Sequence, residues 1–386
     1  MQISILKKNV LIYIAYILVN LYYGFTDTVL NLSFSFYILL GALGLTFLHI
    51  VLVNRYNVKK LLVIIALLGV FGYNYYVTKD SRILVLIITI YGIRDLKLEN
   101  VLKVTFYERI ITTLMVIAAS VVGFNDFYAG RAVLGYSHGN LLMLTITSII
   151  LLYLCIYWKK VTGVTMALLL GIIFVCFVVT ESRTGLVISS LIWLMAFCYK
   201  YLRIRRLLEF AAKYLPSILM IMNVYLALST TRNLLIFADK IPGFSAKFNA
   251  MVDSIDRLLS SRLTLANLVM SNSDIGLLGS VRDEQALSLY KYLVVDSGYI
   301  QLLLVFGILG SVIFLVLNYF MTKELIRRRQ YVYLIAVVAM ALYAFTENSL
   351  CSLKYNFTLL FFIQMFQPDW RYKLMETLRR KKIRKG

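Results

Sequence analysis

Four basic side chains in this sequence have the chemistry needed to handle a phosphorylated substrate: Arg131, His138, Arg183 and Arg262. The planar guanidinium of arginine donates two parallel charge-assisted hydrogen bonds to phosphate oxygens and keeps its charge in a dry site. An imidazole has an unperturbed pKa of about 6.5, which suits a general base near neutral pH. We therefore treat the arginines as candidate ligands of a pyrophosphate and His138 as a candidate proton acceptor.

The local sequences around these residues are polar breaks between apolar runs. Arg131 and His138 share the segment 125–140, NDFYAGRAVLGYSHGN, whose glycines let the backbone fold closely. Arg183 lies in 177–188, FVVTESRTGLVI, where two hydrophobic runs meet across four polar residues. An arginine at the mouth of a membrane hairpin is costly to place and marks a functional-site candidate. The alternative for Arg131 is an anchor at the membrane interface.

Two acidic residues are rival candidates for the base. Asp296 directly precedes an apolar run, where an aspartate also serves as a helix N-cap. Glu347 lies beside Asn348 at the expected outer end of a late apolar run. The sequence leaves the choice between His138, Asp296 and Glu347 open.

The elements that must position these residues are apolar helices. The chain has 386 residues, of which 61% are hydrophobic, against about 45 to 50% in soluble proteins. This composition predicts a single polytopic domain over 1–386, an all-α integral membrane protein with about twelve transmembrane helices. A crossing helix needs about 20 apolar residues, and the fourth and twelfth runs are shorter than that. The apolar runs lie near residues 9–25, 33–53, 61–77, 82–93, 104–123, 139–158, 162–180, 185–199, 214–230, 298–320, 331–347 and 355–368.

The distribution of positive charge predicts the orientation. With the N-terminus inside, 28 of the 40 Lys and Arg residues fall on the inner side, among them Arg109. Of the other 12, 7 lie in one long outer loop and 5 in short outer loops. We therefore expect a protein of the cytoplasmic membrane with both termini in the cytoplasm. The net charge of +21 is then mostly an orientation signal, and a nucleic-acid partner is not expected.

The long loop, residues 231–296, is expected to be extracytoplasmic, between spans nine and ten, and to contain amphipathic helix. Apolar residues recur there at three- and four-residue steps from Phe244 to Val269, and Arg262 falls on the same face. If this face lies on the membrane domain, Arg262 points into it; the alternative is an arginine that reaches lipid headgroups. Asp253 and Asp256 fall on the polar face and are expected to be solvated.

Several motifs of known chemistry are missing from the sequence. It contains no Walker loop, no GxSxG elbow, no HExxH and no close aspartate pair of the kind that holds a metal and a sugar nucleotide. The four cysteines have no metal-ligand spacing. We therefore expect neither a metal nor another cofactor.

Five short elements follow one another along the chain. They are a GRxxxGxxHxN segment at 130–140, Ser182-Arg183-Thr184-Gly185, Ser261-Arg262-Leu263, Asp296-Ser297-Gly298-Tyr299 and Glu347-Asn348. Taken in order, these elements resemble the Wzy-type polysaccharide polymerases, relatives of the O-antigen ligases. The resemblance extends from about residue 125 to 360, although the family often has a proline where Gly139 stands and an asparagine where Ser297 stands.

The resemblance implies an inverting membrane glycosyltransferase that joins undecaprenyl-diphosphate-linked oligosaccharide repeats on the outer side of the membrane. It assigns the donor diphosphate to Arg131, Arg183 and Arg262, catalysis to His138, Asp296 and Glu347, and supporting roles to Asn140, Ser182, Tyr299 and Asn348. Membrane lipids are expected to surround the protein, and the flippase and chain-length regulator of the same pathway are further possible partners.

Three other interpretations stay open. A ligase uses the same chemistry but passes the finished glycan to a different acceptor. A flippase for lipid-linked oligosaccharides requires broken helices and charged residues near the bilayer centre. A scaffold without activity gives no reason for an arginine on an apolar helix face.

Overall fold

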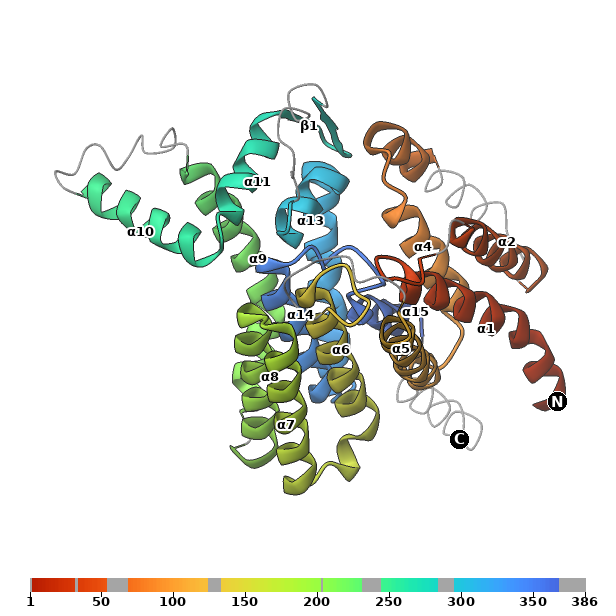
Figure 1. Cartoon of the computed structure of the whole chain (residues 1–386). Helices are drawn as coiled ribbons and strands as arrows, with labels where there is room; N and C mark the ends of the chain where they lie inside the picture. Colours follow the sequence, from red (N-terminus) through yellow and green to blue (C-terminus); the bar gives the residue numbers. More distant parts are fainter. Residues whose placement is uncertain are drawn as a thin grey trace, which may run out of the picture.

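The computed structural model describes residues 2–31, 34–53, 69–123, 133–202, 204–230, 244–283 and 295–367, and helices make up most of them (Figure 1). Residues 69–78 are helical as well, and two short 3-10 helices are η1 (Trp158–Lys160) and η3 (Phe357–Phe362). The α-helices are α1 (Gln2–Phe25), α2 (Ser35–Val53), α4 (Arg82–Ile93), α5 (Leu98–Val121), α6 (Gly139–Tyr157), α7 (Gly163–Thr180), α8 (Arg183–Leu202), α9 (Arg205–Ser229), α10 (Phe244–Leu258), α11 (Arg262–Ser271), α13 (Gly298–Arg327), α14 (Tyr331–Thr346) and α15 (Ile363–Phe366).

Seven of these helices are long and apolar enough to cross a membrane, as expected for a multi-pass membrane protein. They are α2, α5, α6, α7, α8, α9 and α13. Shorter apolar helices cover 9–25, 82–93, 331–346 and 357–366. Residues 61–68 of the third predicted span, 61–77, lie outside the described residues. The twelfth is only η3 followed by the four-residue α15, so the number twelve stays a prediction.

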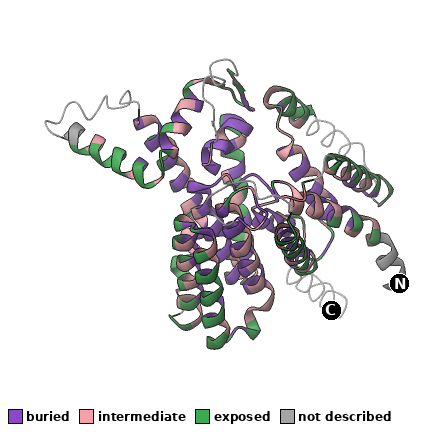
Figure 2. Cartoon of the chain, in the orientation of Figure 1, coloured by how far each residue is buried: buried purple, intermediate pink, exposed green. Residues whose placement is uncertain are grey.

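Helix α14 is the centre of the fold. It packs against α6, α8, α9, α13 and η3, and its sequence YVYLIAVVAMALYAFT is buried along nearly its whole length. A helix that is apolar all round belongs in the interior of a protein or in the apolar core of a membrane, and the burial of α14 places it in the protein interior. Figure 2 shows the buried residues gathered in the middle of the molecule and the exposed ones on the outer faces of α2, α7 and α8, where large apolar side chains face outward as a lipid environment permits.

A buried cluster of hydroxyl groups fixes α6, α8 and α14 relative to one another. Thr147 Oγ1 lies 2.6 Å from Ser189 Oγ and 3.0 Å from the hydroxyl of Tyr343. The third side of the triangle, from Ser189 Oγ to the Tyr343 hydroxyl, is 3.1 Å. Each hydroxyl both donates and accepts, so the three groups satisfy one another away from water.

The amphipathic segment expected from 244 to 269 is two helices, α10 and α11, rather than one. Ser260 and Ser261 both have positive φ, of 57° and 61°, which ends α10 and turns the chain before α11. Asp256 is buried at this turn: its Oδ1 accepts the backbone N–H of Leu263 at 2.8 Å, and its Oδ2 accepts the hydroxyl of Thr264. The expectation of a solvated Asp256 was therefore wrong, because this carboxylate caps α11.

A β-hairpin departs from the all-α expectation. Strands β1 (Ser273–Ile275) and β2 (Ser280–Arg282) pair antiparallel, and the hairpin docks on a break in α13. There Gly307 has a φ of 70°, and the next two amides donate to the hairpin, Ile308 N–H to Gly276 O at 3.1 Å and Leu309 N–H to Leu277 O at 3.0 Å. The kink thus gives the hairpin two backbone partners.

We expect Gly307→Ala to destabilise the protein. A Cβ at this position would lie 2.6 Å from Gly276 O and 2.6 Å from the carbonyl carbon of Leu277, and both are backbone atoms. Together with the positive φ, this predicts a loss of about 2 to 4 kcal/mol in the free energy of unfolding. Thermal unfolding in detergent measures it.

The matched control is Gly171→Ala in α7, where nothing lies within 4 Å of an added Cβ. This change should be neutral or stabilising by up to about 1 kcal/mol, because alanine is the better helix former. Equal melting temperatures for the two variants would contradict the account of the kink.

Candidate functional site

One cavity of about 660 Å³ brings together six of the ten residues proposed from the sequence. They reach it from the ends of different helices: the start of α6, the first residue of α11, the segment before α13 and the segment after α14. The volume is within the usual range for small-ligand sites. The six residues are His138, Asn140, Arg262, Asp296, Glu347 and Asn348.

Arg262 is the most heavily bonded of these residues. Its Nε lies 3.1 Å from Asp296 Oδ2, and its Nη1 donates to Glu347 Oε1 at 3.0 Å and to the backbone carbonyl of Thr346. The side chain is 16% exposed and that of Glu347 is 10% exposed. One guanidinium therefore joins α11 to the start of α13 and the end of α14, and it faces two carboxylates.

Asn140 connects this network to α8. Its Nδ2 donates to Glu347 Oε1 at 2.9 Å, and its Oδ1 accepts the hydroxyl of Ser182 at 2.8 Å. The Ser182 hydroxyl in turn accepts the backbone N–H of Gly185 at 3.2 Å, within the first turn of α8. Asn140 and Arg262 therefore donate to the same oxygen of Glu347, and Ser182 holds Asn140 in place.

His138 is the N-cap of α6. Its Nδ1 accepts the backbone N–H of Asn140 at 3.1 Å. In a neutral imidazole only one ring nitrogen accepts, so this bond leaves the proton on Nε2. In its neutral form, His138 offers the cavity a hydrogen-bond donor rather than a proton acceptor.

The cavity is also lined by two further cations that were not singled out from the sequence, Arg82 and Lys354. Arg82 Nε donates to both carboxylate oxygens of Asp80, at 2.9 and 2.8 Å, and its Nη1 donates to Asn348 Oδ1 at 3.2 Å. Lys354 Nζ lies 2.6 Å from Asp27 Oδ2, which also accepts the hydroxyl of Tyr355 at 2.9 Å. Arg82 and Lys354 were among the five basic residues expected in short outer loops. The scarcity of positive charge on that side was the signal that could have identified them.

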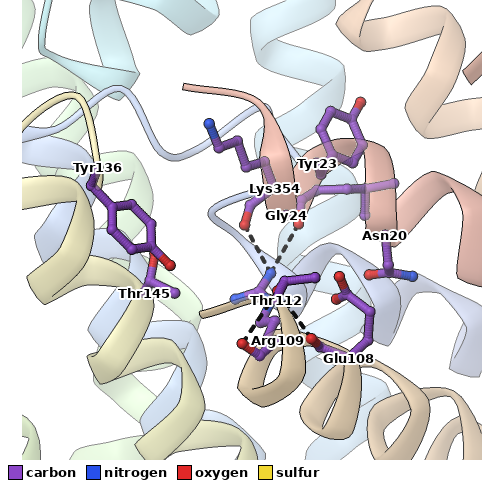
Figure 3. A pocket seen from close by; sticks show the side chains of 10 residues that line it. Asn20, Tyr23, Gly24, Glu108, Arg109, Thr112, Tyr136, Thr145 and Lys354 are labelled. Carbon is purple, nitrogen blue, oxygen red and sulfur yellow. Dashed lines mark hydrogen bonds between the residues drawn. The ribbon is translucent and has the colours of Figure 1, made fainter. Parts of the chain in front are cut away.

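Arg109 supports the segment that carries Lys354. The sequence analysis placed it on the inner side, but it is buried in the middle of α5, where its Nη2 donates to the carbonyls of Leu353 and Lys354 at 3.0 and 2.9 Å (Figure 3). The small cavity around it, about 30 Å³, shares Tyr23 and Lys354 with the larger one. Glu108 also lines it, and its buried Oε1 has no hydrogen-bond partner among the described residues.

Burial dominates the acidity of the groups in the cavity. It raises the pKa of Glu347 to about 7, against the opposing attraction of Arg262. It also raises the pKa of Asp296, again opposed by Arg262. Burial lowers the pKa of Lys354 to about 8, although Asp27 favours its charged form. For Asp27 itself, burial is outweighed by Lys354 and by the hydrogen bonds from Lys354 and Tyr355, so its pKa is lowered.

The remaining proposed residues lie elsewhere. Arg183 is exposed at the start of α8 and does not line the cavity, although the preceding Ser182 bonds to Asn140. Tyr299 is buried and donates its hydroxyl to the carbonyl of Ala341 at 2.9 Å, which ties α13 to α14. Arg131 lies outside the described residues, so its role stays a prediction.

Within the part of the chain that the structure describes, no three His, Cys, Asp or Glu side chains are grouped so that they could hold a metal ion. A scan of the sequence against protein-family models found no match, and neither a search of curated proteins nor one of solved structures found one. We therefore infer the function of the cavity from the residues that line it.

We expect the stability of the protein to fall as the pH rises from about 5 to 8, and Glu347 to cause part of this fall. A carboxyl whose pKa is raised by folding contributes stability below its ordinary pKa of 4.5, and this contribution is lost as the pH rises through about 7. The full difference is on the order of 3 kcal/mol. Glu347→Gln should flatten the dependence of the melting temperature on pH.

Glu99→Gln is the matched control, since Glu99 is exposed and paired with Lys103 near the start of α5. It should leave the slope unchanged. Asp296 retains a raised pKa in both variants, so some slope remains in Glu347→Gln. A slope equal to that of the wild type in Glu347→Gln would show that this carboxyl does not titrate in the range.

Proposed function

We propose that this chain is a polysaccharide polymerase, an inverting membrane glycosyltransferase that joins undecaprenyl-diphosphate-linked oligosaccharide repeats. The observation that carries the proposal is the single cavity into which separate segments place three carboxylates, an imidazole and three cations. These groups are the ones that glycosyl transfer from a diphosphate requires: a base for the acceptor hydroxyl and positive charge for the leaving group. The order of motifs that resembles the Wzy-type polymerases supports the same reaction.

The reaction breaks one bond and forms another at the same carbon. The acceptor hydroxyl oxygen attacks the anomeric carbon of the donor sugar, and the bond from that carbon to the diphosphate oxygen breaks with inversion. The hydroxyl proton passes to a base, and the electron pair leaves with the diphosphate. Cations near the leaving oxygen stabilise the charge that develops there.

Glu347 is the best-placed base. Its pKa of about 7 makes it a stronger proton acceptor than an ordinary carboxylate while a large share remains ionised near neutral pH. Asn140 and Arg262 both donate to its Oε1, which fixes the orientation of the group. His138 is better suited to donate from Nε2 to a hydroxyl or a phosphate oxygen, because its Nδ1 is occupied by the N–H of Asn140.

The cations of the cavity bind the diphosphate only by sharing or exchanging their carboxylate partners. Arg262 is paired with Asp296 and Glu347, Arg82 with Asp80, and Lys354 with Asp27. Arg262 is the first choice for the leaving group, since it lies between both candidate bases and transfer of a proton to Glu347 removes one of its two negative partners. Arg82 and Lys354 also line the cavity and can contact a second phosphate or the acceptor sugar.

A ligase requires the same groups, so the cavity supports it equally, and the acceptor distinguishes the two activities. A flippase is the other candidate, and two observations favour it. Glu108 and Arg109 are buried in the middle of α5, as expected for polar groups along a transport path, and α13 is broken at Gly307. However, the cavity beside Glu108 and Arg109 is only about 30 Å³. This volume holds about one water molecule and no sugar, so we prefer the transferase.

The direct test is incubation of the purified protein with lipid-linked repeat units in detergent or nanodiscs, with the products separated by size. A polymerase yields a ladder of longer glycans on the lipid. A single shift onto a second lipid acceptor identifies a ligase. Movement of intact substrate across liposomes without any new glycosidic bond would reject the transferase in favour of the flippase.

In the same assay we expect Arg262→Ala to lose about 2 to 4 kcal/mol of transition-state stabilisation, a fall in elongation rate of about 30- to 1,000-fold. Arg262→Lys should recover only part of this, because lysine keeps the charge but loses the fork. Glu347→Gln should slow transfer on the order of 100-fold or more if Glu347 is the base. The rates are compared at matched expression, with binding of the lipid-linked donor measured in parallel.

Arg257→Ala is the matched arginine control. Arg257 is exposed on α10, only five positions from Arg262, and does not line the cavity. It should elongate at the wild-type rate. Arg183→Ala tests whether the exposed Arg183, which does not line the cavity, contacts the diphosphate; a strong loss is expected if it does. Near wild-type elongation in Arg262→Ala would refute the proposed role of the cavity.

A further inference from the structure

A second large pocket, of about 520 Å³, lies at the other end of the helices that form the candidate site. It is lined from the first turns of α5, the end of α6 with η1, and the connection between α13 and α14. The candidate site lies instead at the start of α6 and at the end of α14. The 19 residues of α6 span about 28 Å, so the two pockets are separated by nearly the thickness of a bilayer core.

This inner pocket is strongly basic. Four cations line it, Lys103, Lys159, Lys160 and Arg329, against the single carboxylate of Glu99. Glu99 is already paired with Lys103 at 2.7 Å. In the part of the chain that the structure describes, Lys159, Lys160 and Arg329 are exposed and have no carboxylate partner. The pocket therefore has positive charge available for an anion.

The backbone holds these cations at the pocket mouth. Lys159 and Lys160 lie in η1, the tight turn that ends α6, and Val161 N–H closes that turn on Trp158 O at 3.2 Å. Arg329 has a φ of 58°, a left-handed conformation that costs a non-glycine residue free energy. Its N–H donates to Ile326 O at 2.9 Å, which holds the turn. The cations thus come from two connections that are far apart in the sequence.

Aromatic side chains form the walls and apolar side chains the floor. The rings of Trp158 and Tyr199 lie 5.4 Å apart, and Lys160 Nζ lies 6.0 Å from the centre of the Tyr157 ring. The floor includes the buried Cys155 and Val332. Tryptophan and tyrosine favour the depth at which lipid headgroups meet the acyl chains. The pocket is therefore amphipathic, with its charge at the mouth.

An apolar groove of about 460 Å³ lies next along the same helices. Tyr157, in the wall of the basic pocket, packs its ring 5.4 Å from Tyr153 and 6.1 Å from Phe106, both of which line the groove. From there the groove continues along α5, α6 and α7 between outward-facing apolar side chains such as Leu114 and Leu168. A basic mouth beside an apolar groove matches the shape of a lipid with a charged head.

We propose that this pocket and groove together bind one anionic phospholipid, with its phosphate headgroup at Lys159, Lys160 and Arg329 and an acyl chain in the groove between α5, α6 and α7. A free phosphate compound would use the same cations but not the groove. Basic pockets between membrane helices recognise anionic headgroups in this way. The site is independent of the activity at the other end of the bundle.

The test measures how much phosphatidylglycerol the purified protein and its variants retain after exchange from nanodiscs of mixed phosphatidylglycerol and phosphatidylcholine. Native mass spectrometry counts the bound lipid molecules. The wild type should retain phosphatidylglycerol selectively. The triple variant Lys159→Gln, Lys160→Gln, Arg329→Gln should retain about tenfold less. Leu168→Trp, which fills the groove without changing charge, should also lower retention. Bound lipid should raise the melting temperature of the wild type but not that of the triple variant.

The matched control is Lys97→Gln, Arg206→Gln, Lys323→Gln, which removes three exposed charges near the same end of the bundle but outside the pocket. It should retain lipid like the wild type. Equal retention by the pocket and control variants would overturn the proposal. A different result would overturn the lipid as the ligand. In it, the protein binds inorganic phosphate in phosphatidylcholine discs and shows no selectivity for phosphatidylglycerol. The triple variant of the pocket loses this phosphate binding, whereas Leu168→Trp does not affect it.

Discussion

The guanidinium of Arg262, held between Asp296 and Glu347, is the interaction on which the candidate site depends. A largely buried charge is stable only when it is paired and hydrogen-bonded, and removing one partner leaves the others uncompensated. This pairing joins α11 to the start of α13 and the end of α14. Because Asp256 caps α11 at its first turn, the helix that carries Arg262 is itself fixed in direction. The arginine therefore enters the cavity from a rigid element rather than from a loose loop.

The part of the same network that contains Asn140 depends on the packing of the helix bundle. Asn140 bonds both Glu347 and Ser182, so the ends of α6, α8 and α14 meet at one carboxylate. Deeper in the bundle, hydroxyl groups of these same three helices form a closed cluster. Buried polar networks of this kind specify one arrangement of helices, because a shifted helix would leave several groups unsatisfied. The position of Glu347 is thus a consequence of packing well below the cavity.

The sequence predicted those features that depend on composition and on the side of the membrane. Long apolar runs predicted helices that are long and apolar enough to span a membrane. The shared outer side of Arg131, His138, Arg183 and Arg262 predicted that these four could form one site. Of the four, His138 and Arg262 line the cavity, Arg183 does not, and Arg131 lies outside the described residues. The sequence could not predict features that arise from contacts between distant segments. Asp256 can cap α11 only because the chain turns at Ser260 and Ser261. The spacing of the apolar residues continues through this turn without interruption, so no sign of it is visible in the sequence.

The same reason explains two further differences. Gly307 adopts a positive φ where the hairpin docks, and nothing in the apolar run 298–320 indicates a break. Arg109 was counted with the basic residues of the inner side, near the start of the apolar run 104–123. Arg109 is stable in the interior because its guanidinium donates hydrogen bonds to the backbone carbonyls of Leu353 and Lys354 and to the hydroxyl of Ser148. One of these carbonyls belongs to Lys354, so the buried arginine positions a cation of the cavity that no local motif revealed. The cation at Lys354 is consequently held in position by contacts inside the bundle, which is what binding of the proposed diphosphate substrate requires.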